Sequence, residues 1–299
     1  MVRVAWLGLG AMGDPMARRL AGTVDEVVAF DVVADRAAAL SDAGVRAAGS
    51  PAEAASSADV VFVMVASPDQ AMDALFGEEG AAAAIPEGAA VVVTSTVGPA
   101  AVLEIEARLA RVGVRVLDAP VSGGVARART GELVIMVGGA MDLFEAVQPI
   151  LDRLGANVTR VGDTVGDGQS VKLVNQLLCG VHIAAAAEAL GFAASLGLDP
   201  KAVWEVIRHG AAGSFMLNDR GGRMLDHGYE PVRSALSIFV KDMGLVVDAA
   251  KKHHFPTPLA SAAEQLYLMG AGSGLARLDD ASVVTLYERW AGREVTAAP

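Results

Sequence analysis

A lysine and an asparagine stand three residues apart in an otherwise apolar stretch of this chain. Residues 166–197 read GDGQSVKLVNQLLCGVHIAAAAEALGFAASLG, and after residue 168 they hold no proline. They predict a helix longer than about 20 residues, buried on nearly every face, with Lys172 and Asn175 on one side. Burial and a place near the helix start both favour a neutral amine, which can exchange protons near neutral pH. Taken alone, these residues fit better a lysine that extends into solvent.

A glycine-rich loop follows the first predicted strand, residues 2–7. It reads GLGAMG and leads directly into a helical pattern. In G-x-G-x-x-G, the first glycine allows a tight turn, the second a close approach of a pyrophosphate and the third helix–strand packing. The free N–H groups at the helix start then bind phosphates. We therefore expect a dinucleotide on this loop, with its pyrophosphate on residues 10–12: Gly8, Leu9, Gly10, Ala11, Met12 and Gly13.

An acidic residue ends the second predicted strand, residues 26–30. Asp31 stands about 20 residues beyond the glycines, where a carboxylate binds the ribose hydroxyls of NAD and repels the extra phosphate of NADP. The plain alternative is that Asp31 starts a turn. Arg36 is close by in the sequence and could accommodate that phosphate, so the sequence indicates NAD with NADP possible.

Strand and helix patterns alternate through the first half of the chain and then stop. Repeated βα units predict an α/β fold with a doubly wound parallel sheet in a Rossmann-type domain, residues 1–165. Residues 200–288 show helical patterns only, so residues 166–299 should form an all-α domain that begins with an interdomain helix at 169–196. Ligands collect where parallel strands end. Val65, Ala66 and Thr96 follow strands and should border the cofactor, although Thr96 could equally be a turn or cap residue.

Two further segments carry polar groups that could meet a substrate. Ser122, Gly123 and Gly124 expose a hydroxyl and backbone N–H groups with little steric cover, which suits a carboxylate; a plain Gly-Gly turn is an equal alternative. Lys241 and Asp242 interrupt an apolar helical pattern at 238–250. They are either an ordinary exposed pair or a lysine that reaches the cofactor or substrate.

The composition excludes some classes of binding partner and indicates the cellular compartment. The net charge of −11 argues against nucleic acid or an anionic membrane as partner, and we expect no metal site. A single cysteine, Cys179, fits a reducing compartment. The chain shows no run of about 18 strongly apolar residues, and its N-terminal run resembles a strand more than a leader. These features predict a cytoplasmic protein.

Taken together, these segments resemble the β-hydroxyacid dehydrogenase family. The match covers nearly the whole chain, through GLGAMGDPM, STV, DAPVSGG, GQSVKLVNQ and FVKDMGL in that order. The resemblance implies that Lys172 is the catalytic lysine and that Ser122, Gly123, Gly124 and Asn175 hold the substrate. It also implies that Thr96 and Lys241 touch the cofactor, and that the helical domain forms a homodimer or homotetramer.

Within the family, the chain looks most like the L-threonate dehydrogenase branch. The runs GVHIAAAAEAL, KDMGLVVDAAKKHHFPTPLAS and LDDASVV carry this likeness. It implies NAD-dependent oxidation of a small hydroxy acid, with L-threonate and a 3-hydroxyisobutyrate-like acid as the candidate substrates. Three alternatives stay open: an NADPH-dependent reductase of small semialdehydes, an imine reductase, and a non-catalytic cofactor-binding module. Asp31 argues against the first, and Lys172 argues against the other two.

Overall fold

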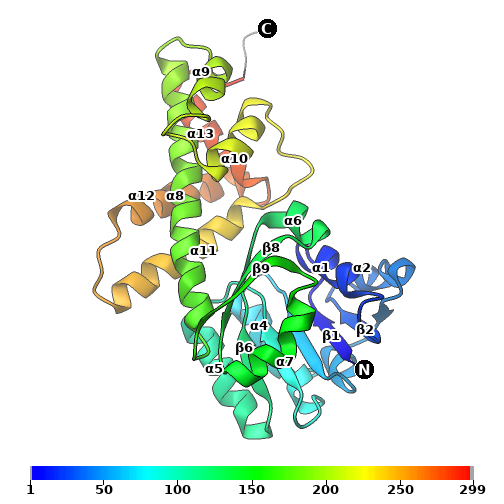
Figure 1. Ribbon diagram of the computed structural model, residues 1–299. Helices are drawn as coiled ribbons and strands as arrows, with labels where there is room; N and C mark the ends of the chain where they lie inside the picture. Colours follow the sequence, from blue (N-terminus) through cyan, green and yellow to red (C-terminus); the bar gives the residue numbers. More distant parts are fainter. Residues whose placement is uncertain (1, 297–299) are drawn as a thin grey trace. The chain divides into compact units, whose positions relative to one another are not determined.

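The computed structural model describes residues 2–296, which form two compact units (Figure 1). The first unit ends at Lys172 and the second begins at Leu173. This division falls inside helix α8, Asp167–Ser195, which runs without interruption from one unit into the other. The boundary expected from the sequence, after residue 165, lies just before this helix.

The first unit contains one nine-stranded sheet in the part of the chain that the structure describes. Its strand order is β3-β2-β1-β4-β5-β6-β8-β7, and β9 pairs with β8. Strands β1 to β6 are parallel to one another. From β1 the chain first adds strands on one side of the sheet, β2 and β3, and then on the other side, starting with β4. The strands are β1 (Arg3–Leu7), β2 (Glu26–Phe30), β3 (Arg46–Ala47), β4 (Val60–Val63), β5 (Ala90–Val93), β6 (Arg115–Asp118), β7 (Val121–Ser122), β8 (Leu133–Gly138) and β9 (Gly155–Gly162).

The Rossmann-type fold is confirmed, but the sheet is not parallel throughout. Strand β8 runs antiparallel to both β6 and β7. Strand β7 has two residues and α6 (Gly124–Thr130) has seven, and neither is predicted by the sequence patterns. Elements this short are too short to show a hydrophobic periodicity, so the sequence of this segment resembled a plain Gly-Gly turn.

Helices cover both faces of this sheet. Alternate residues of β1 point to opposite sides: Val4 and Trp6 enter one buried core, and Ala5 and Leu7 enter another. Helix α7 (Met141–Leu151) packs on β6 and β9, and α5 (Pro99–Leu109) packs on β6 (Figure 1). The remaining helices of this unit are α1 (Gly13–Leu20), α2 (Ala34–Ala38), α3 (Pro51–Ala55) and α4 (Pro68–Phe76), with 3-10 turns at Ser41–Ala43, Ala81–Ala83 and Ala110–Val112.

The start of α3 at Ser50 departs slightly from a capping box. Ser50 Oγ accepts the N–H of Glu53 at 3.1 Å, as in that motif. The Glu53 carboxylate, however, accepts from the backbone N–H of Gly49 at 2.7 Å, one residue before the cap. The two bonds together still satisfy two backbone donors at the start of α3.

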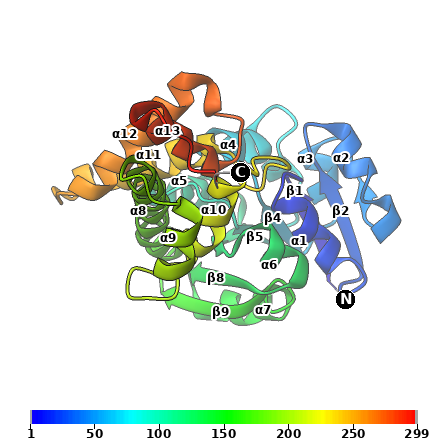
Figure 2. The same cartoon turned by 90° about the horizontal axis from the view of Figure 1, so that it is seen from above.

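All the regular secondary structure in the described residues of the second unit is helical, and turns and loops join the helices; one isolated bridge pairs Ala235 with Asp279. Helices α11 and α12 lie side by side and share one apolar core with α8 (Figure 2). Helix α12 continues as a π-helical turn, Ala271–Leu275, with a break at Gly274. Beyond α8 the elements are α9 (Pro200–Ile207), α10 (Phe215–Leu225), α11 (Leu236–Lys252), α12 (Pro258–Gly270), the π turn Ala271–Leu275, a 3-10 turn at Asp280–Val283 and α13 (Val284–Ala291).

Helix α8 is less completely buried than its sequence predicts. One stripe along it is exposed and apolar, consisting of Val171, Val174, Leu178 and Phe192. By length and composition alone the helix could also cross a membrane, which the sequence argument did not anticipate. A single helix of this kind is weak evidence for a membrane span, because the core helices of globular proteins share these properties. The exposed stripe is better suited to protein–protein contact.

Candidate active site

The glycine-rich loop between β1 and α1 has the close backbone contacts that its sequence predicts. Gly8 has a φ of +98°, and a Cβ there would lie 2.3 Å from the Met64 carbonyl oxygen. At Gly13 a Cβ would lie 2.0 Å from the Gly8 carbonyl oxygen. Gly10 differs, because no atom lies within 4 Å of the position that its Cβ would take. Open space at the second glycine is what a diphosphate requires.

Asp31 is buried directly beside this loop. Its Oδ2 accepts the backbone N–H of Leu9 at 2.7 Å, and its Oδ1 accepts that of Val33 at 2.8 Å. The Arg36 guanidinium, which is half exposed, lies 3.3 Å from Oδ1. A carboxylate has about four acceptor positions, so these bonds leave capacity for a ribose hydroxyl. The glycine loop and Asp31 together fit a nicotinamide dinucleotide.

Residues predicted to border the cofactor lie on neighbouring strand ends. The backbone N–H of Val65 donates to Ser95 Oγ at 2.7 Å, which ties the end of β4 to the end of β5. Ala66 donates its N–H to Gln70 Oε1 at 2.9 Å, at the start of α4. Thr96 follows Ser95 and is half-buried. The carboxyl ends of β1, β2, β4 and β5 therefore present the predicted cofactor contacts at one edge of the sheet.

Asp118 anchors the start of α8 to this same edge. It ends β6, is fully buried, and accepts the N–H groups of Gly166 at 2.8 Å and Gln169 at 2.6 Å. Burial raises the pKa of Asp118 to about 6, although the two N–H donors act in the opposite direction. The first turn of α8 lies close to the sheet, because a Cβ at Gly168 would lie 2.4 Å from the carbonyl oxygen of Met136 in β8.

Ser122, Gly123 and Gly124 run from the end of β7 into the first residue of α6, shortly after Asp118. Ser122 is half-buried in β7, and both glycines have positive φ, 138° and 73°. A Cβ at Gly123 would lie 2.8 Å from the Arg127 side chain, whereas Gly124 has open space around it. The segment is thus a glycine-dependent bend that leaves backbone exposed at Gly124.

Lys172 lies on α8 three residues after Gln169, whose N–H is held by Asp118. Its side chain is 5% exposed, so the solvent-extended lysine favoured by the local sequence does not form. Asn175 follows three residues later on the same helix and is half-buried. Its Nδ2 donates to Gln176 Oε1 at 2.8 Å and lies 3.4 Å from Cys179 Sγ. A buried amine with a carboxamide on the same helix face has the composition of an acid–base site.

The second unit holds Lys241 in a buried polar group of its own. Lys241 Nζ lies 2.7 Å from Asp242 Oδ1, and Asp242 Oδ2 accepts a short hydrogen bond from the Gln176 carboxamide. Asp242 is 2% exposed, so the pair is not the ordinary exposed pair that was one alternative. The sequence patterns did not single out Gln176, Gln169 or Asp118 as a group. For Gln169 and Gln176 a signal was available, because polar side chains recur at every third or fourth position of the otherwise apolar helix α8.

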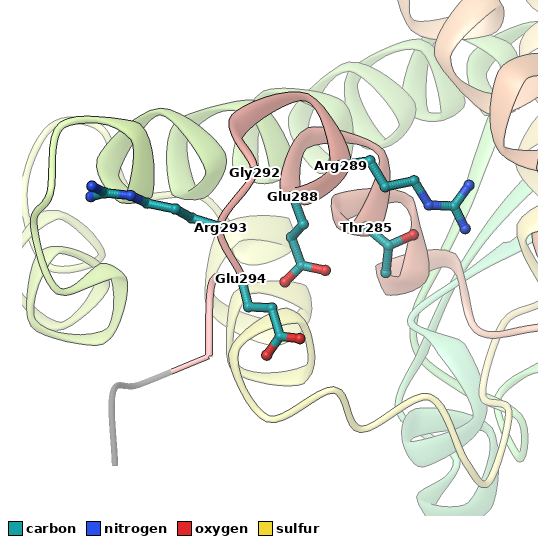
Figure 3. Close-up of a pocket in the computed structure, with 6 residues that line it drawn as sticks. All are labelled: Thr285, Glu288, Arg289, Gly292, Arg293 and Glu294. Atoms are coloured by element: carbon teal, nitrogen blue, oxygen red, sulfur yellow. The ribbon is translucent and has the colours of Figure 1, made fainter.

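A separate cavity of about 270 Å³ lies in the second unit, at α13 and the segment after it (Figure 3). Glu288 in its wall accepts the N–H of Val295 at 2.8 Å and lies 2.8 Å from His227 Nε2. These contacts hold the end of the described chain in place. None of the site residues predicted from the sequence lines this cavity, which contains Thr285, Glu288, Arg289, Gly292, Arg293 and Glu294.

A doubly wound sheet with an open glycine loop and a buried carboxylate beside it fits a nicotinamide-dependent oxidoreductase. Residues 3–162 match the NAD binding domain of 6-phosphogluconate dehydrogenase. Residues 166–287 match the NAD-binding family of NADP-dependent 3-hydroxyisobutyrate dehydrogenase. The chain therefore belongs to the β-hydroxyacid dehydrogenase family, and it acts on the CH–OH group of a small hydroxy acid.

Individual relatives cover almost the whole chain. L-threonate dehydrogenase of Cupriavidus necator is 41% identical over 281 residues, 94% of each chain. 2-Hydroxy-3-oxopropionate reductase of Escherichia coli K12 is 35% identical over 296 residues, which cover 98% of this chain and all of the relative. The crystal structure of a 3-hydroxyisobutyrate dehydrogenase from Salmonella typhimurium is 38% identical, has a TM-score of 0.89, and covers 96% of this chain and 100% of its own.

Proposed function

We propose that this chain oxidises a short sugar acid such as L-threonate with NAD, using Lys172 as the general base. The observation that carries the proposal is the burial of Lys172 on a helix whose first turn is fixed to the carboxyl edge of the nucleotide-binding sheet. The similarity to an L-threonate dehydrogenase supports the choice of substrate. The same residues would reduce the corresponding keto acid in the reverse direction.

The cofactor should lie on the glycine loop, with its pyrophosphate at Gly10 to Met12 and its adenine ribose on Asp31. When bound, its nicotinamide supplies the hydride acceptor for the oxidation. Asp31 favours NAD because its negative charge repels the extra phosphate of NADP. Thr96 and Lys241 are proposed as further cofactor contacts, together with the backbone at Val65 and Ala66.

Lys172 acts on the substrate hydroxyl in this mechanism. Its neutral amine takes the hydroxyl proton at Nζ as hydride leaves the adjoining carbon, and as an ammonium it returns that proton in the reverse direction. Burial and the positive end of α8 both favour the neutral amine before the reaction. Asn175 orients the hydroxyl and the amine by hydrogen bonds. Ser122 and the backbone N–H groups of Gly123 and Gly124 hold the carboxylate.

A reductase of small semialdehydes is the second candidate. The 2-hydroxy-3-oxopropionate reductase relative supports it, and so does the Arg36 guanidinium beside Asp31, which could bind the phosphate of NADP. Ser214, Phe215 and Asn218 are proposed to select the substrate from the helical unit. Ser214 Oγ also caps α10 by accepting the N–H of Leu217 at 3.0 Å, which fixes the start of that helix.

One screen tests the proposal. Purified protein is assayed in both directions with NAD(H) and NADP(H) against L-threonate, 3-hydroxyisobutyrate, glycerate and tartronate semialdehyde. The result expected is fastest turnover with L-threonate and NAD. Lys172→Ala should lower kcat by at least about 100-fold, because well-placed acid–base groups contribute about 100- to 10,000-fold. NADH should still bind this variant, and near-normal turnover would reject the role of Lys172.

We further propose that the chain forms a homodimer or homotetramer through its helical unit. The exposed stripe on α8, Val171, Val174, Leu178 and Phe192, gives an apolar surface that a second copy could cover. A cytoplasmic location remains a prediction from the sequence, in accord with the single cysteine and the net charge of −11.

A further inference from the structure

The carboxamide of Gln169 joins three backbone groups of the loop after β5. Its Oε1 accepts the N–H groups of Val97 and Gly98, each at 3.0 Å. Its Nε2 donates to the carbonyl oxygen of Ser95 at 2.9 Å. The Gln169 side chain is fully buried, so water cannot replace these bonds if they are lost.

These three hydrogen bonds are called the Gln169 clamp below. The position of Gln169 on α8 connects the clamp to the proposed catalytic lysine. Its backbone N–H donates to Asp118 Oδ2 at 2.6 Å, so the carboxylate at the end of β6 fixes the first turn of the helix. Its side chain then fixes the loop after β5 to that same turn. Lys172 follows three residues later, within the same rigid helix.

The clamped loop is linked in turn to the end of β4. Ser95 Oγ accepts the N–H of Val65 at 2.7 Å and donates to the Val63 carbonyl oxygen at 3.1 Å. Thr96 lies between Ser95 and the clamped N–H groups. An unbroken series of hydrogen bonds therefore runs from the strand end at Val65, through the loop of Thr96, to the helix of Lys172.

We propose that Gln169 is a positioning residue for hydride transfer: it holds the loop of Thr96 in register with the helix of Lys172. This inference rests on the proposed roles of Lys172 and Thr96. The proton leaves the hydroxyl oxygen and the hydride leaves the carbon that bears it, so the amine and the cofactor edge need a fixed separation. A misplacement of about 1 Å can cost about 100-fold in rate, and a buried carboxamide with three backbone partners prevents it.

The test compares Gln169→Leu, Gln169→Glu and a stability control. Leucine is apolar and one atom shorter than glutamine, and it removes all three hydrogen bonds. Glutamate keeps acceptors for Val97 and Gly98 but cannot donate to Ser95. Leu151→Ala, buried in α7, creates a cavity in the core of the same unit without touching the clamp, and should cost about 2–5 kcal/mol of stability.

Steady-state kinetics use L-threonate, or whichever of the four screened substrates the wild-type chain turns over fastest. Gln169→Leu should lower kcat by about 10- to 100-fold while the KM for that substrate and the Kd for NADH change by less than about fivefold. Gln169→Glu should lower kcat by a smaller factor than Gln169→Leu. Leu151→Ala should lose thermal stability but keep kcat within about threefold of wild type at a temperature where it is folded. A kcat of Gln169→Leu within threefold of wild type, beside an inactive Lys172→Ala, would overturn the inference and leave the proposed function intact.

Amide hydrogen exchange gives a readout that needs no substrate. In Gln169→Leu, the Val97 and Gly98 amides should exchange at least about tenfold faster than in wild type, whereas in Gln169→Glu they should stay protected. The Ser95 amide, which donates to the Val63 carbonyl oxygen at 3.2 Å, is the internal reference. Unchanged exchange at Val97 and Gly98 in Gln169→Leu would refute the clamp even if the chain oxidised none of the acids.

Discussion

Asp31 Oδ2 accepts a hydrogen bond from the backbone N–H of Leu9 at a distance of 2.7 Å. The bond joins the end of β2 to the first turn of the glycine-rich loop, and it lies in a buried position. Asp31 therefore shapes the loop, and in the proposed site it would also offer its charge to the ribose. Under that proposal, cofactor choice and loop geometry depend on the same carboxylate.

Replacing Asp31 by Asn should shift the cofactor preference toward NADP. The amide keeps the size of the side chain but removes the charge that repels the extra phosphate. We expect kcat/KM for NAD to fall by about 10- to 100-fold, because hydrogen bonds to a charged group contribute about 1.5–3 kcal/mol. The value for NADP should fall less or rise. Initial rates with both cofactors measure the ratio.

The control for this experiment is Asp59→Asn. The Asp59 carboxylate also accepts a backbone N–H, from Arg3 at 2.8 Å, but it lies where β1 and β4 begin rather than where they end. Its replacement should leave the cofactor ratio unchanged. An equal ratio in wild type and Asp31→Asn would remove Asp31 from the cofactor site.

Alanine at Gly10 and at Gly13 should have opposite consequences. At Gly13 the new methyl group would meet the Gly8 carbonyl oxygen at 2.0 Å, and such overpacking typically costs about 1–3 kcal/mol of stability. At Gly10 it meets no protein atom within 4 Å, so Tm should not fall, but the methyl would occupy the space expected for the pyrophosphate. Thermal unfolding and NADH fluorescence titration of the two variants separate these effects. Unimpaired NADH binding by Gly10→Ala would place the phosphates elsewhere.

The pH dependence of stability should reveal Asp118. Its pKa rises from 3.8 in the unfolded chain to about 6 in the folded one, so the folded state binds the proton more readily. This contribution to stability is fully present below pH about 3.8 and is lost as the pH rises through about 6, a difference of about 3 kcal/mol.

Asp118→Asn removes this titration. The free energy of unfolding of wild type, minus that of the variant, should therefore increase by up to about 3 kcal/mol between pH about 7.5 and about 4. Urea unfolding at a series of pH values measures the difference, and other titrating groups cancel because both chains contain them. Parallel curves for the two proteins would show that Asp118 is already ionised throughout this range.

A buried ion pair in the second unit should matter far more than an exposed one in the first. Both Asp279 oxygens lie 2.5 Å from Arg223 Nη1, and Asp279 is fully buried. Asp279→Ala would leave a buried guanidinium without this partner, at a cost of about 3–5 kcal/mol. Asp142, exposed and paired with Arg115, should tolerate the same change with almost no shift in the unfolding midpoint. Similar midpoints for the two variants in urea would contradict this difference.

The sequence by itself determined the elements whose signals are local. The glycine spacing at residues 8–13 and the acid at the end of the second strand indicated a dinucleotide-binding domain. The apolar run around Lys172 indicated a long helix, because proline is absent from it and helix formers dominate. The resemblance of the ordered motifs pointed to the β-hydroxyacid dehydrogenase family, which the comparisons confirm. None of these inferences needed a contact between distant parts of the chain.

Only the tertiary structure decided how these pieces are fixed to one another. The bonds from Gln169 to Val97 and from Asp118 to Gln169 join residues that are 72 and 51 positions apart. The reversed direction of β8 is also a matter of pairing between strands rather than of period. Propensity and periodicity act over a few residues, whereas a buried carboxamide or carboxylate acquires its role from whichever backbone groups the fold brings within about 3 Å of it.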